Sequence, residues 1–171
     1  MPIFRPFDNN VKVDQQLKQL LAVRPLVILG VGSELRSDDS WAHFLIRKLK
    51  SYCPADVYPI WCSTMPENFI KPACSFAPKA VLIVDSADMG LRPGNIRFMN
   101  DLQGVEDPPQ THRMPLDVMA GMIKDRSGAH VSYFFMQPKN IEFSSEMSDE
   151  VSRSAEKIAE FFKKTLWKKN T

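Results

Sequence analysis

The sequence predicts an α/β fold: a three-layer, twisted, mostly parallel sheet of about five strands with helices on both faces. Two observations lead to this prediction. Short apolar runs alternate along the chain with stretches whose apolar residues have helical spacing. The two strongest runs, residues 26–31 and 79–88, are almost uniformly apolar until the second ends in acids. Such runs are typical of parallel strands that are buried on both faces.

Each element follows from local signals. Apolar residues at helical spacing predict helices at 11–22, 37–52, 66–76, 114–127 and 148–168. The helix at 66–76 begins with a proline, which is favourable at the first helical position. Apolar or alternating runs predict strands at 26–31, 56–61, 79–88, 94–100 and 130–138. Pro59 places the second strand at an edge or at a strand end, and Pro72 should bend or break the third helix. We expect a single domain over 1–171, with residues 1–24 as an N-terminal extension that carries a helix.

Bulk properties exclude several classes of protein. The net charge of +2 argues against a nucleic-acid partner. The sequence has neither an apolar stretch long enough to span a membrane nor a signal-peptide pattern, so we expect a cytoplasmic protein without membrane insertion. The three cysteines, an odd number with no CxxC pair, are expected to be reduced and buried.

The stretch GVGSELRSDD at 30–39 follows the first strand and contains two glycines and three acids. It lacks the third glycine of the dinucleotide fingerprint and the Gly-Lys-Ser/Thr ending of a P-loop. Acids at the helix entrance would also repel a phosphate. We expect Gly30 and Gly32 to allow a tight turn. Asp38 is either a helix cap or a ligand, and Asp39 is the better ligand candidate.

Further polar groups fall where other strands end. Asp85 closes the apolar run at 79–88, Asp88 could stabilise the turn that follows, and His112 lies in a loop before a helix. Because ligands of open α/β sheets bind at the carboxyl ends of the strands, Asp39, Asp85 and His112 could together form a site for nickel, zinc or iron.

Two alternatives stay open. Asp39 and His43 are four residues apart on the expected helix, so they could chelate a metal or share a hydrogen bond. Cys62, at the end of the second strand, is the cysteine nearest to the same crevice and the weaker candidate for a nucleophile.

Several segments, in order, resemble the hydrogenase maturation proteases, which trim the C-terminal tail of [NiFe]-hydrogenase large subunits. These segments are LGVGSELRSDD, STMPEN, VLIVDSADMGLRPGNIRF and THRMPLDVM. The resemblance covers roughly residues 26 to 165 and is closest to the branch that serves formate-hydrogenlyase and membrane-bound hydrogenases.

The resemblance implies that Asp39, Asp85 and His112 are the catalytic and metal-binding residues. It further implies that they recognise nickel already inserted in the precursor of the large subunit, and that zinc or cadmium could occupy the site in isolated protein. Cleavage would then release a short C-terminal peptide.

The chain departs from the family pattern at Ser33, Ser40, Trp41 and Cys62-Ser63-Thr64. We expect these residues, Trp41 above all, to add bulk around the crevice. Trp41 and Ser40 motivate an alternative function, a metal- or precursor-binding chaperone that uses the same pocket without proteolysis. A third hypothesis is a zinc hydrolase that acts on a small molecule. The sequence lacks an HExxH motif, which excludes zinc proteases of that kind.

Overall fold

The computed structural model describes residues 11–102 and 115–167, which form one five-stranded sheet in the order β2-β1-β3-β5-β4. The strands are β1 Leu26–Val31, β2 Val57–Ser63, β3 Ala80–Ser86, β4 Ile96–Met99 and β5 His130–Met136. Neighbouring strands are parallel except β4, which pairs antiparallel with β5. The mostly parallel sheet predicted from the sequence is therefore confirmed, with Pro59 on edge strand β2.

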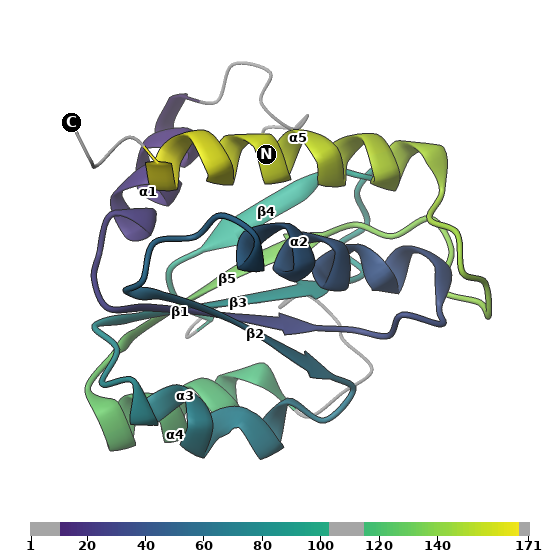
Figure 1. The fold of residues 1–171 in the computed structure, drawn as a ribbon. Helices are drawn as coiled ribbons and strands as arrows, with labels where there is room; N and C mark the ends of the chain where they lie inside the picture. Colours follow the sequence, from purple (N-terminus) through teal and green to yellow (C-terminus); the bar gives the residue numbers. More distant parts are fainter. Residues whose placement is uncertain (1–10, 103–114, 168–171) are drawn as a thin grey trace.

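Helices cover both faces of this sheet, as predicted. The α-helices are α1 Val11–Leu21, α2 Trp41–Lys50, α3 Ile70–Ser75, α4 Leu116–Ser127 and α5 Asp149–Trp167. Figure 1 shows α1, α2 and α5 on one face and α3 with α4 on the other. Each face buries its own apolar cluster, one centred on α2 and α5 and the other on α3 and α4. Among the helices of the described ranges, none combines the length and the apolar character that crossing a bilayer demands.

Two predicted helices begin differently from the expectation. Short 3-10 turns, η1 Ser37–Ser40 and η2 Pro66–Phe69, precede α2 and α3. The third helix thus changes geometry before Pro72, which lies in the first turn of α3, where a missing N–H is tolerated. Neither Ser37 nor Asp38 caps α2: its N-cap residue is Ser40, without a side-chain capping bond.

Candidate functional site

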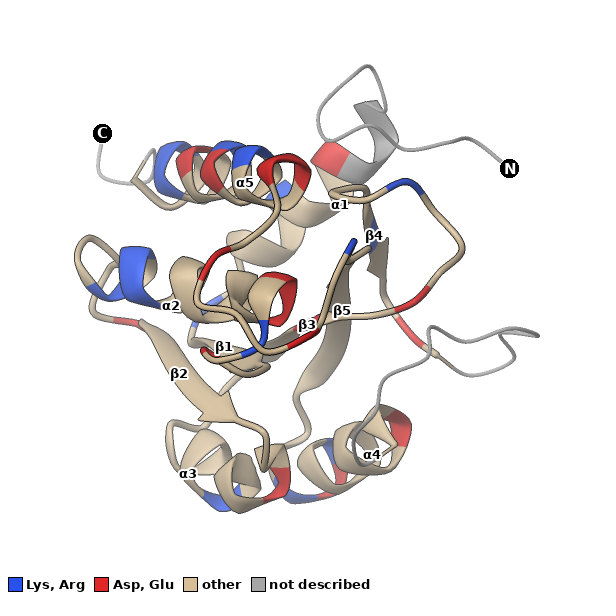
Figure 2. Cartoon of the chain, turned by 90° about the vertical axis from the view of Figure 1, so that its right-hand side faces the viewer, with Lys and Arg blue, Asp and Glu red and all other residues tan. Residues whose placement is uncertain are grey.

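A cavity of about 530 Å³ lies at the carboxyl edge of the sheet, where ligands of open α/β folds bind. The lining comes from Arg36 and Asp39 in and before η1, from Thr64 after β2, and from residues 86–88 at and after the end of β3. It is completed by residues 137–141 of the β5–α5 loop, which spans 137–148. Figure 2 looks onto this edge and shows residues of both charge signs along the loops. The cavity therefore offers carboxylates and cations to a polar ligand.

Asp39 reaches the cavity through a tight turn after β1. The amide of Ser33 donates to the carbonyl oxygen of Asp39 at 3.2 Å, and the amide of Asp39 donates to Arg36 O at 2.8 Å. A Cβ atom at Gly32 would overlap the carbonyl oxygen of Asp39, so only glycine permits this close approach. Asp39 is 6% exposed and lines the cavity. The glycine at 32 thus sets the position of this acid.

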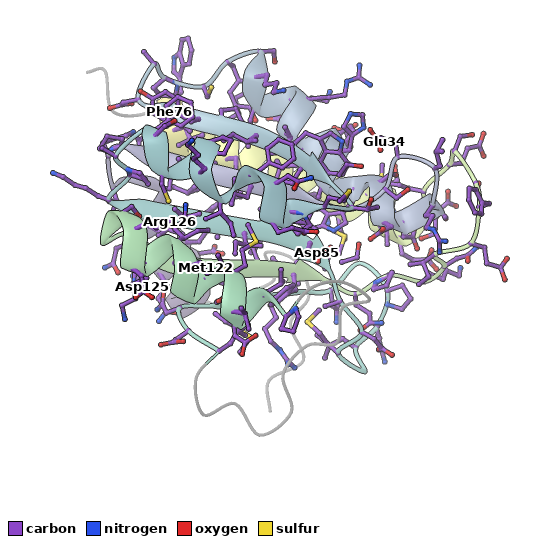
Figure 3. The ribbon with its side chains drawn as sticks, turned by 90° about the horizontal axis from the view of Figure 1, so that it is seen from below. Glu34, Phe76, Asp85, Met122, Asp125 and Arg126 are labelled. Carbon is purple, nitrogen blue, oxygen red and sulfur yellow. The ribbon has the colours of Figure 1, made fainter. Side chains whose placement is uncertain are left out.

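Asp85 lies one residue before the end of β3 and is fully buried. Its Oδ1 accepts the backbone N–H of Ser86 at 2.8 Å, and the Ser86 hydroxyl donates to the carbonyl oxygen of Asp38 at 3.4 Å. Figure 3 shows Asp85 toward the same end of the molecule as Glu34, with Phe76, Asp125 and Arg126 toward the other end. The end of β3 and the η1 turn therefore meet at one edge.

The structure describes two of the three residues that are predicted to form the metal site. Asp39 and Asp85 belong to neighbouring segments at the carboxyl edge, whereas His112 lies outside the described residues. Within 11–102 and 115–167, no group of three His, Cys, Asp or Glu side chains could hold a metal ion. The assignment of Asp39, Asp85 and His112 to one site thus stays a prediction.

Asp38 has a role that the sequence did not reveal. Its buried carboxylate accepts the backbone N–H groups of Lys139 at 2.7 Å, Asn140 at 2.9 Å and Ser148 at 2.6 Å. It also accepts the Ser148 hydroxyl at 3.0 Å. Of the two alternatives for Asp38, the helix cap is therefore wrong, because both carboxylate oxygens bind the β5–α5 loop instead. Lys139 and Asn140 line the cavity, so Asp38 holds one of its walls in place.

Gln137 is a second residue that sequence reasoning missed. Its Oε1 accepts the backbone N–H groups of Met89 at 2.7 Å and Leu91 at 3.2 Å, and its Nε2 donates to Asp88 Oδ1 at 3.3 Å. The same oxygen of Asp88 accepts the Gly90 amide at 3.2 Å, which confirms the predicted turn role of Asp88. Gln137 thus fixes the loop after β3 against the loop after β5, and no local pattern signals that contact.

His43 is engaged away from the cavity lining. Its ring packs on Trp61, with ring centroids 4.9 Å apart, and Trp61 Nε1 donates to Glu34 Oε1 at 2.9 Å. Burial lowers the pKa of His43 below 6.5, against the opposing charge of Glu34. These contacts favour a packing role for His43 over the alternative chelate with Asp39.

Burial also decides the roles of Cys62 and Trp41. It raises the pKa of the Cys62 thiol to about 12, so the sulfur is neutral near pH 7 and a poor nucleophile.

Trp41 is fully buried in the cluster shared by α2 and α5, with its ring edge-on to the ring of Phe134 and the ring centroids 6.0 Å apart. The expectation that Trp41 adds bulk around the crevice is therefore wrong: it faces the core.

Comparisons with known proteins agree with this architecture. The family model HycI, described as hydrogenase maturation protease, matches residues 45–164. The hydrogenase 3 maturation protease of Escherichia coli K12 is 30% identical over 133 residues, which cover 77% of this chain and 85% of that protein.

Two solved structures are also similar. The crystal structure of HycI, a [NiFe] hydrogenase maturation protease from Thermococcus kodakarensis, has a TM-score of 0.81 at 27% identity and covers 88% of this chain and 98% of its own. The solution structure of the endopeptidase HycI from E. coli has a TM-score of 0.72 at 28% identity, with 85% and 92% covered. The chain therefore belongs to the hydrogenase maturation protease family, and it is an endopeptidase of hydrogenase maturation.

Proposed function

We propose that this protein removes a short C-terminal peptide from the precursor of a [NiFe]-hydrogenase large subunit after nickel has been inserted. Membership of the family supports the class of reaction. The observation that carries the proposal is the cavity at the carboxyl edge of the sheet, which Asp39 lines. Its volume suits a short stretch of polypeptide, since pockets of this size enclose ligands about as large as a few amino-acid residues.

In this proposal Asp39, Asp85 and His112 recognise the nickel, which belongs to the substrate and is no resident cofactor of this chain. Two carboxylates and an imidazole form an oxygen- and nitrogen-donor set that first-row metals accept, and nickel binds such donors more tightly than iron does. The burial of Asp85 supports this role, because a carboxylate withdrawn from water gains most from a nearby cation. Zinc or cadmium would compete for the same donors.

Intact-mass spectrometry tests the proposal directly. Purified protein should convert the nickel-loaded precursor to a species lighter by one C-terminal peptide, and should leave the nickel-free precursor unchanged. Asp39→Asn and His112→Ala should abolish this conversion, whereas Glu142→Gln, a change at an exposed acid of the β5–α5 loop, should retain it. Circular dichroism controls for folding. An unchanged mass of the loaded precursor with wild-type protein would refute the proposal.

The same assay separates proteolysis from the non-proteolytic chaperone. A chaperone would form a stable complex with the precursor and leave its mass unchanged. One of the two residues that suggest the chaperone is Trp41, which lies in the core rather than at the crevice. The other departure, Ser40, donates its hydroxyl to Ser37 O at 2.6 Å within η1. Neither residue gives a structural reason to expect loss of proteolysis.

A further inference from the structure

Three exposed apolar side chains lie one or two positions in the sequence from residues that line the cavity. Leu35, Met65 and Phe143 are 62%, 53% and 77% exposed, and together we call them the apolar rim. Leu35 precedes the lining residue Arg36, Met65 follows the lining residue Thr64, and Phe143 is two residues beyond Ile141, which also lines the cavity. Seven large apolar side chains are exposed in the described residues, so three of the seven lie beside lining residues of one cavity in the sequence. Such a concentration marks an interaction surface rather than scattered exposure.

Backbone contacts bring two members of the rim together. The Ser144 amide donates to Leu35 O at 3.1 Å, and the Ser37 amide donates to Ser144 O at 2.8 Å. The segment that carries Leu35 therefore runs beside the segment that carries Phe143. The guanidinium of Arg36 lies over the Phe143 ring, 5.2 Å from its centroid. Phe143 is thus supported from within the protein while most of its surface faces water.

The loop that presents Phe143 is held before any partner arrives. Asp38 binds this loop at Lys139, Asn140 and Ser148, on both sides of Phe143. Binding to a surface that is already ordered avoids the entropy cost of fixing side chains and loops at the moment of association. An ordered loop that exposes an aromatic ring beside a cavity has the properties of a docking contact, since aromatic anchors dominate interface energies.

We propose that the apolar rim docks the folded body of the large-subunit precursor while its C-terminal tail enters the cavity. This inference rests on the proposed function, which supplies the partner. The cavity has room for only a short stretch of chain, so the remainder of a protein substrate meets the surface around the cavity mouth. The matching surface on the precursor is apolar and borders the base of its tail.

Binding and trimming are measured separately with wild type, Leu35→Ser, Met65→Ser, Phe143→Ser and Phe143→Leu. The control is Trp167→Ser, which removes a ring of similar exposure, 69%, at the C-terminal end of α5. Figure 1 shows this end of α5 opposite the β5–α5 loop. The dissociation constant of the full precursor and of a precursor truncated at the cleavage site is measured by biolayer interferometry. The KM for trimming is measured with the nickel-loaded precursor.

Phe143→Ser should raise the dissociation constant for both precursor forms and the KM about tenfold, as loss of an interface anchor does. Leu35→Ser and Met65→Ser should raise them less, Phe143→Leu should retain most of the affinity, and Trp167→Ser should match wild type. Rim variants that all bind like wild type, or a wild-type protein that does not bind the precursor, would overturn the inference. Rim-dependent binding without any trimming would instead refute the proposed function alone.

Discussion

Asp38 and Ser148 are joined by two hydrogen bonds although 110 positions separate them in the chain. Oδ1 of Asp38 accepts the Ser148 amide at 2.6 Å, and Oδ2 accepts the Ser148 hydroxyl at 3.0 Å. The next residue, Asp39, lines the cavity. The two adjacent acids thus have separate tasks: the first holds the β5–α5 loop, and the second faces the ligand space.

Asp38→Asn should destabilise the protein. The new amide group would place N–H donors where the carboxylate accepts donors from Lys139, Asn140 and Ser148, and a broken buried network of this kind costs about 2 kcal/mol. Urea unfolding followed by circular dichroism measures the change in the free energy of unfolding. Glu150→Gln, which breaks an exposed ion pair with Lys139, is the control and should leave the midpoint unchanged. Equal midpoints for Asp38→Asn and wild type would contradict this role.

Trp41→Phe should lower stability without altering substrate affinity. The smaller ring leaves part of the core volume empty, at a cost of about 1–2 kcal/mol, while Trp41→Ala should cost about 3–5 kcal/mol. Because Trp41 is buried in the core against Phe134 of β5, the KM for the precursor should match that of wild type at a temperature where Trp41→Phe is folded. A changed KM in a fully folded variant would show that Trp41 does shape the site.

Cys62 should be the slowest cysteine to react with a thiol reagent. Its pKa of about 12 leaves almost no thiolate near pH 8, and its side chain is buried, whereas Cys53 and Cys74 are partly exposed. Mass-mapped alkylation of native protein measures the order of labelling. Cys62→Ala should also retain trimming. Rapid labelling of Cys62, or inactivity of a folded Cys62→Ala variant, would restore it as a candidate nucleophile.

His43 should titrate below its ordinary pKa of 6.5. Since folding disfavours the protonated ring, the unfolded chain binds the proton first, and stability is lost as the pH falls below 6.5 toward the pKa of the folded state. A two-dimensional NMR titration of the ring measures this pKa. Trp61→Ala should raise it by admitting water, and Glu34→Gln should lower it by removing a favourable charge. A wild-type midpoint at or above 6.5 would contradict the burial argument.

The fold could be predicted because its signals are local. The apolar runs at 26–31 and 79–88 lie within a few residues of β1 and β3, and strand–helix alternation determines the layers. The position of Asp39 followed from the same logic, since turns after parallel strands meet at one edge of a sheet.

The roles of Asp38 and Trp41 could not be predicted in this way. The partners of Asp38 lie 101 to 110 positions further along the chain, and no periodicity connects such distant residues. The expectation for Trp41 comes from the family pattern, in which a small residue stands at this position shortly after the two acids. A helix turns by about 100° at each residue, so a neighbour in sequence can face the opposite side. Trp41 begins α2 and packs in the core against Phe134 of β5, whereas Asp39 lines the cavity.

The bond between Asp38 and Ser148 also fixes when the cavity can exist during biosynthesis. One wall, residues 137–141, belongs to a loop that Asp38 anchors, and the last residue of this loop that Asp38 binds is Ser148. A nascent chain therefore has no fully anchored cavity until Ser148 has left the ribosome, because such long-range contacts form only after the intervening chain is available. A fragment that ends before the β5–α5 loop would keep both adjacent acids and still have no cleft in which to hold a substrate.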